Sequence, residues 1–171
     1  MLSFIYGTLA RLSAASGANK MDFQLSCLEE KLRDRLKEIR ERTPDSIGAM
    51  MEYELLRCDS DRGEVVFRCK TLPWMRNIPG TLHGGMCATI LDQAMGFVAY
   101  CAKSGEGTAP TVQLTVNYHR PIIPGDYILV NVHVLSASKS LMHLRSEAYR
   151  EENPEKICLS GNSVFFNNDF I

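Results

Sequence analysis

One segment of the chain combines a glycine-containing turn, an apolar helix and a single carboxylate. Residues 77–92 read Asn-Ile-Pro-Gly-Thr-Leu-His-Gly-Gly-Met-Cys-Ala-Thr-Ile-Leu-Asp, and Asp92 is the only charged residue within 84–102. Burying a charge is costly unless the charge is paired or used. Asp92 therefore has either a structural partner, such as Gln93, Thr111 or a tyrosine hydroxyl, or a chemical task.

His83-Gly84-Gly85 stands where the apolar helix begins. The first turn of a helix leaves backbone N–H groups without partners, and the helix dipole makes that end partly positive. Glycines let another molecule approach these donors closely. Such a place suits a carbonyl oxygen that becomes an oxyanion. The simpler alternatives are that His83 caps or orients the turn and that Asn77 is only a turn residue.

Asp92 lies eight residues after Gly84, which is roughly 12 Å along a helix axis at about 1.5 Å per residue. A carboxylate and an oxyanion site that far apart cannot serve the same bond. If both act on one bond, Asp92 must come from another subunit. Two antiparallel copies of this helix, related by a twofold axis, would bring Asp92 of one chain toward Gly84 and Gly85 of the other. An enzymatic function therefore requires a dimer.

The elements that position these groups follow from hydrophobic periodicity. Helix 84–102 is apolar nearly all round, so it should be buried on most sides. A second helix over residues 22–42 carries one apolar stripe that should dock on the main domain or on a partner subunit. Strands are predicted over residues 51–58, 63–70, 111–119, 127–137, 141–150 and 156–166, with Asn153-Pro154 in a turn. This order predicts an α+β fold in which about six strands wrap one long buried helix, with an extra N-terminal helix.

The bulk composition is that of one ordinary globular domain, with 171 residues of which 45% are hydrophobic and 23% charged. The net charge of −1 gives no electrostatic case for nucleic acid or a membrane surface as partner. No apolar run reaches the roughly 20 residues that span a bilayer. The six cysteines show no zinc-like spacing, so no metal site is expected. Free thiols in a reducing compartment predict a cytoplasmic location.

The chain divides into three segments. Residues 1–20 contain two basic residues, several Ser and Ala, and no acid. That composition faintly resembles a transit peptide, which would give an organelle location. We favour a disordered or expression-derived leader, followed by the amphipathic helix segment at 21–44 and the main domain at 45–171.

The combined motifs resemble the hotdog-fold acyl-CoA thioesterases of the PaaI-like group. The matching positions are Asn77-x-x-Gly80-x-x-His83-Gly84-Gly85, Asp92, Asn117-Tyr118-x-x-Pro121 and Pro124-Gly125-Asp126. The resemblance covers about residues 45–167. It implies a hotdog fold, in which a curled antiparallel sheet wraps a central helix. It also implies a homodimer with a continuous sheet, often paired into a homotetramer.

The resemblance further implies hydrolysis of an acyl-CoA thioester to a free acid and CoA, with no cofactor other than the CoA of the substrate. In similar enzymes the position of Asp92 is the nucleophile or general base. The backbone N–H matching Gly85, or its neighbour Gly84, polarises the thioester carbonyl. The position of Asn77 orients the attacking water or the carboxylate, and that of His83 supports the carbonyl side.

Thr111 matches a Ser or Thr that some relatives use to hold the carboxylate or the water. Four basic residues are candidates for contacts with pantetheine or the CoA phosphates, although surface basic residues are usually only solvated: His119, Arg120, Lys139 and Arg145.

Two other functions fit the same fold. The first is a non-catalytic acyl-CoA sensor, in which helix 22–42 would connect to a regulated partner. The second is a hydratase or dehydratase, which pairs Asp or Glu with a histidine placed otherwise. Here His83 lies nine residues before Asp92, at the wrong end of the helix for that chemistry.

Overall fold

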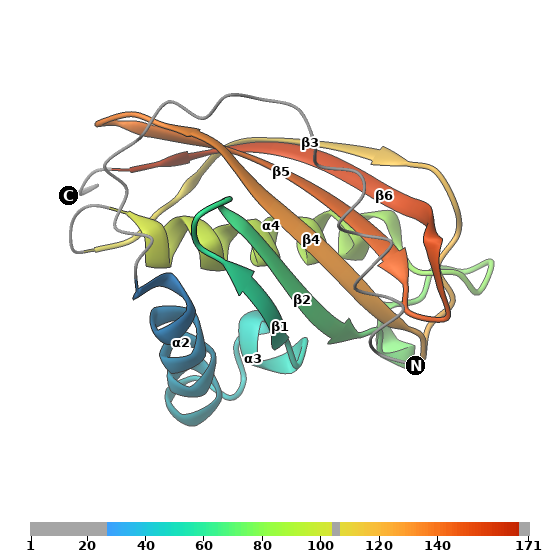
Figure 1. Cartoon of the computed structure of the whole chain (residues 1–171). Helices are drawn as coiled ribbons and strands as arrows, with labels where there is room; N and C mark the ends of the chain where they lie inside the picture. Colours follow the sequence, from blue (N-terminus) through green and yellow to red (C-terminus); the bar gives the residue numbers. More distant parts are fainter. Residues whose placement is uncertain (1–26, 104–106, 168–171) are drawn as a thin grey trace.

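A computed structural model describes residues 27–103 and 107–167 (Figure 1). Six strands form one antiparallel sheet in the order β1-β2-β4-β5-β6-β3, and the sheet curls around the long helix α4. The predicted α+β hotdog architecture is thus confirmed. The leader at 1–20 and the first residues of the predicted helix 22–42 lie outside the described residues.

The helices are α2 (Leu28–Arg42), α3 (Ile47–Met50), the 3-10 helix η3 (Pro73–Met75) and α4 (Gly84–Ala102). The strands are β1 (Glu54–Asp59), β2 (Glu64–Lys70), β3 (Thr111–Tyr118), β4 (Tyr127–Ala137), β5 (Leu141–Arg150) and β6 (Asn153–Phe166). The predicted bounds of α4, β4 and β5 are confirmed to the residue.

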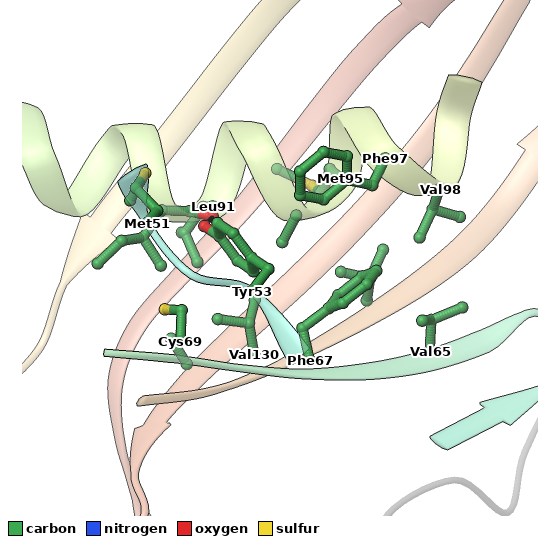
Figure 2. Packing of buried hydrophobic residues seen from close by; sticks show 14 of the residues in the cluster. Met51, Tyr53, Val65, Phe67, Cys69, Leu91, Met95, Phe97, Val98 and Val130 are labelled. Atoms are coloured by element: carbon green, nitrogen blue, oxygen red, sulfur yellow. Dashed lines mark hydrogen bonds between the residues drawn. The ribbon is translucent and has the colours of Figure 1, made fainter. Parts of the chain in front are cut away.

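α4 is the centre of the hydrophobic core. Its buried residues lie on nearly every side: Cys87, Ile90, Leu91, Ala94, Met95, Phe97, Val98, Ala99, Cys101 and Ala102. Alternate residues of β2, namely Val65, Phe67 and Cys69, point toward the helix as the two-residue period of a strand requires (Figure 2). The sheet therefore supplies the cover that an all-round apolar helix needs.

Tyr53 ties the chain before β1 to the middle of α4. Its ring meets Phe97 edge-on with ring centroids 5.3 Å apart, and its hydroxyl donates to the Ile90 carbonyl at 2.7 Å (Figure 2). This buried hydroxyl is bonded only two residues before Asp92. The position of that stretch of helix is therefore set by a directional bond as well as by packing.

α2 docks on the main domain, which was one of the two alternatives from its apolar stripe. Leu28, Leu32, Leu36 and Ile39 are buried, and the helix packs on α4, α3 and β1. The Arg35 guanidinium lies 4.3 Å from the centroid of the Tyr100 ring, near the C-terminal end of α4.

Two predicted boundaries are wrong. Strand 51–58 begins only at Glu54, because Ser46 caps the short helix α3 and Glu52 adopts a left-handed φ of 48°. The turn predicted at Asn153-Pro154 lies two residues earlier: Arg150 pairs with Asn153, so residues 151–152 form the connection and β6 begins at Asn153. A proline is tolerated at the start of a strand, so Pro154 did not mark a break.

No helix in the described ranges is long and apolar enough to cross a membrane.

α4 approaches the sheet closely at Gly161 in β6. A Cβ added there would lie 3.0 Å from Leu91 Cδ1 and 3.0 Å from the Thr115 carbonyl oxygen. At Gly96, also between α4 and the sheet, an added Cβ would lie 3.7 Å from the Phe165 ring, which is an ordinary contact.

We therefore expect Gly161→Ala to lower the free energy of unfolding by about 1–2 kcal/mol, because the extra methyl crowds a packed site. The matched control Gly96→Ala should be neutral or stabilise by up to about 1 kcal/mol through helix propensity. Urea unfolding of both variants measures the difference. Equal free energies of unfolding for the two variants would show that α4 does not pack closely against Gly161.

Candidate active site

Asp92 lies in the middle of α4, where the helix faces the beginning of the edge strand β3. Its Oδ1 accepts the Thr111 hydroxyl hydrogen at 3.0 Å, and the side chain is half-buried. Burial raises the pKa of Asp92 above its ordinary value, while the hydrogen bond from Thr111 opposes part of that rise. A carboxylate with a raised pKa binds protons better and is a stronger base.

The raised pKa has a consequence for stability. The folded chain binds the Asp92 proton more tightly than the unfolded chain does. This group therefore favours folding at low pH, and its contribution is lost as the pH rises from the ordinary pKa to the raised one. Near neutral pH the half-buried charge of Asp92 costs stability.

The N-terminus of α4 is held by short-range hydrogen bonds. His83 is the N-cap residue, and its Nδ1 accepts from the Gly85 amide at 3.0 Å. The Tyr118 hydroxyl donates to the Gly84 carbonyl at 3.0 Å. The chain before the helix is fixed by the bonds from the His83 amide to the Met75 carbonyl and from the Leu82 amide to the Ile122 carbonyl.

Asn77 organises the loop before α4. Its side-chain amide donates to the Thr81 hydroxyl at 2.9 Å and its Oδ1 accepts from the Thr81 amide at 3.0 Å. The next turn contains Gly80 at φ 96°, a conformation that glycine adopts without strain. Within a single chain Asn77 is therefore a turn residue, which is one of the two roles expected for it.

The structure thus brings the predicted residues together in two groups. His83, Gly84 and Gly85 form the first group, at the start of α4. Asp92 and Thr111 form the second, which helix geometry places roughly 12 Å further along. Within one chain these groups do not meet.

The four basic candidates lie in different places. His119 Nε2 lies 2.8 Å from Ser160 Oγ, and Arg120 donates to the Ile157 carbonyl at 2.6 Å; both follow Tyr118, which touches Gly84. Lys139 lies in the β4–β5 turn. Arg145 alternates with the core residue Leu144 on β5, so it points to the outer face of the sheet, away from α4.

Tyr118 is the residue whose role the sequence did not show. A Cβ on Gly84 would lie 3.8 Å from its ring, so Tyr118 covers the first turn of the helix. The only signal was its place in the Asn117-Tyr118 pair. Among the described residues there is no group of three His, Cys, Asp or Glu side chains that could hold a metal ion.

Comparison with known proteins shows which proteins this chain is similar to. The model of the thioesterase superfamily matches residues 79–157. Human acyl-coenzyme A thioesterase 13 is 32% identical over 79 residues, which is 46% of this chain and 56% of that protein. Bovine acyl-coenzyme A thioesterase THEM4 is 29% identical over 115 residues, covering 64% of this chain and 45% of that protein. The chain thus spans about half the length of these relatives.

Solved structures share the fold. Thioesterase superfamily member 2 from Mus musculus superposes with a TM-score of 0.65 at 20% identity, over 81% of this chain and 96% of that one. The E. coli PaaI protein of the phenylacetic acid degradation operon gives a TM-score of 0.68 at 16% identity, over 83% and 96%. These structures share the predicted hotdog fold, and the family model and the relatives support the resemblance that the motifs indicated.

We expect Thr111→Val to raise the pKa of Asp92 further above its ordinary value, because it removes the hydrogen bond that favours the charged form. The control Thr111→Ser keeps the hydroxyl and should leave the pKa of Asp92 close to that of the wild type. Titration of the Asp92 carboxyl carbon by ¹³C NMR measures both variants. An unchanged pKa in Thr111→Val would mean that the hydroxyl does not hold the carboxylate in solution.

Proposed function

We propose that this chain is a member of the hotdog-fold thioesterase superfamily, in the PaaI-like group, and that it hydrolyses acyl-CoA thioesters to a free acid and CoA. Relatives named acyl-CoA thioesterase support the reaction. A Streptococcus mutans protein of the same fold has been crystallised with acetyl CoA, which supports the substrate class. The observation in this chain that carries the proposal is the half-buried Asp92, bonded to Thr111, on the helix that begins at His83-Gly84-Gly85.

In the proposed mechanism Asp92 acts as a general base. It takes a proton from water, and the resulting hydroxide attacks the thioester carbonyl carbon. The carbonyl oxygen gains negative charge and is held by donors at the start of α4. The carbon–sulfur bond then breaks, and the proton passes from Asp92 to the CoA thiolate. Direct attack by Asp92, which would form an anhydride that water then hydrolyses, remains the alternative order of events.

The mechanism requires two subunits. β3 is an edge strand of the sheet, and its residues Val112 and Tyr118 are 48% and 56% exposed. A long unpaired edge of this kind favours pairing with another strand. Antiparallel pairing of β3 with the same strand of a second copy would continue the sheet and set the two α4 helices antiparallel. Asp92 of each chain would then face the α4 N-terminus of the other.

This homodimer is the unit that the reaction needs, and a homotetramer would be a pair of such dimers. The six cysteines are all free thiols in the structure, which supports the cytoplasmic location predicted from the sequence.

We expect Asp92→Asn to lower kcat by at least roughly 100-fold, since it removes the general base. The protein should stay folded, because the substitution removes a half-buried charge. The control Asp61→Asn changes an exposed carboxylate in the β1–β2 turn and should keep full activity. The assay is thiol release from a panel of acyl-CoAs. A wild type that hydrolyses none of them, or a fully active Asp92→Asn, would refute the proposal.

Subunit mixing tests the shared site. Asp92→Asn and His83→Ala should each be nearly inactive. Unfolding and refolding them together in equal amounts gives heterodimers for half of the population, and each heterodimer has one intact site. We therefore expect roughly a quarter of wild-type activity to return. No recovery, with heterodimers demonstrated by mass, would place both groups in one chain's own site.

A further inference from the structure

His83 caps α4 through its ring rather than through a short polar side chain. Nδ1 accepts the Gly85 amide hydrogen at 3.0 Å. To accept, Nδ1 must have a free lone pair, so the neutral ring carries its proton on Nε2. A doubly protonated ring could not accept this bond. The Gly85 amide therefore selects one form of the imidazole.

The same bond also sets the direction of the ring. His83 is exposed, and its Nδ1 edge is turned toward the backbone of the first helical turn. The opposite edge, with the Nε2 hydrogen, points away from Gly85, and no described residue accepts a hydrogen bond from it. The ring thus presents a donor beside the start of α4, where Gly84 contributes the first amide of the helix.

We propose that Gly85 is a positioning residue: its amide fixes the tautomer and orientation of His83, so that His83 Nε2–H and the Gly84 amide together hold the thioester oxygen. This inference rests on the proposed function and refines it. Of the two glycine amides that the resemblance allowed as donor, the Gly85 amide is already engaged by His83. The Gly84 amide then acts on the substrate, and the Gly85 amide acts through the imidazole.

The need for glycine at position 85 follows from the same contact. A Cβ there would lie 3.1 Å from His83 Nδ1 and 3.3 Å from Cε1. A residue with a Cβ, other than proline, keeps its amide, but the His83 ring must then shift by a few tenths of an ångström from the position in which Nδ1 accepts the bond. Gly96 in the same helix offers a control, because a Cβ there meets the Phe165 ring at 3.7 Å.

NMR of the whole ¹⁵N-labelled chain tests the bond without substrate. We expect the neutral His83 ring to be protonated on Nε2, and a scalar coupling to cross the hydrogen bond between the Gly85 amide nitrogen and Nδ1. In Gly85→Ala the coupling should vanish, while Gly96→Ala should retain it. A His83 ring protonated on Nδ1, or no coupling in the wild type, would overturn the inference.

Kinetics test the catalytic consequence. His83→Asn keeps a capping oxygen for the helix but lacks the Nε2 donor, so kcat should fall by roughly 100-fold with little change in KM. Gly85→Ala should lower kcat by a similar factor. In the double variant the loss should not exceed that of His83→Asn alone, because Gly85 acts only through the ring. Gly96→Ala should match the wild type.

The outcomes separate this inference from the proposed function. If the wild type hydrolyses acyl-CoA but Gly85→Ala is equally active, the positioning role is wrong and the function stands. If Gly85→Ala costs as much in the His83→Asn background as in the wild type, Gly85 acts independently of the ring and the inference fails. If the wild type is inactive while the coupling is present, the function fails and His83 is only a helix cap.

Discussion

The fixed rise of an α-helix is the constraint on which the site depends. Gly84 and Asp92 lie in one continuous helix, so their separation along its axis cannot change while the helix is intact. The two groups of candidate residues therefore never meet within one chain. Under the proposed function, catalysis requires a second chain related by a twofold axis. Each subunit then contributes a base to one site and oxygen-binding donors to the other.

The fold serves this constraint by holding α4 on several sides. The inner face of the sheet covers most of the helix, Tyr53 bonds to its backbone near Asp92, and α2 packs against its C-terminal half. Gly161 leaves room for Leu91 of the helix to pack closely on β6. Asp92 faces the edge strand β3, whose Thr111 donates a hydrogen bond to the carboxylate. Rigidity and the open edge together favour a site completed by a second copy.

Much of this arrangement could be predicted from the sequence, because the signals were periodic. The all-round apolar pattern bounded by His83-Gly84-Gly85 gave α4 its limits, and alternation gave the sheet. The start of β1 was wrong because a cap at Ser46 and a left-handed residue at Glu52 override alternation locally. The connection at 151–152 has no glycine or proline to mark it. The turn was therefore predicted at Asn153-Pro154, and the predicted start of β6 was too late.

The candidate site was predictable to a smaller degree. Thr111 was expected beside Asp92 and lies there, and His83 was considered as a possible cap and is one. The contact of Tyr118 with Gly84 joins residues that are far apart in the chain, and no local pattern reports such a contact. Arg145 was selected only for its charge, which carries no information about the face of the sheet on which it lies.

The most direct measurement is a crystal structure with an acyl-CoA analogue in which a methylene group replaces the thioester sulfur. The account predicts that the analogue's carbonyl oxygen lies about 3 Å from the Gly84 amide of one subunit, with the Asp92 carboxylate of the other subunit facing the carbonyl carbon. A bound analogue whose carbonyl faces no Asp92, or faces the Asp92 of the same chain that supplies the amide, would contradict it.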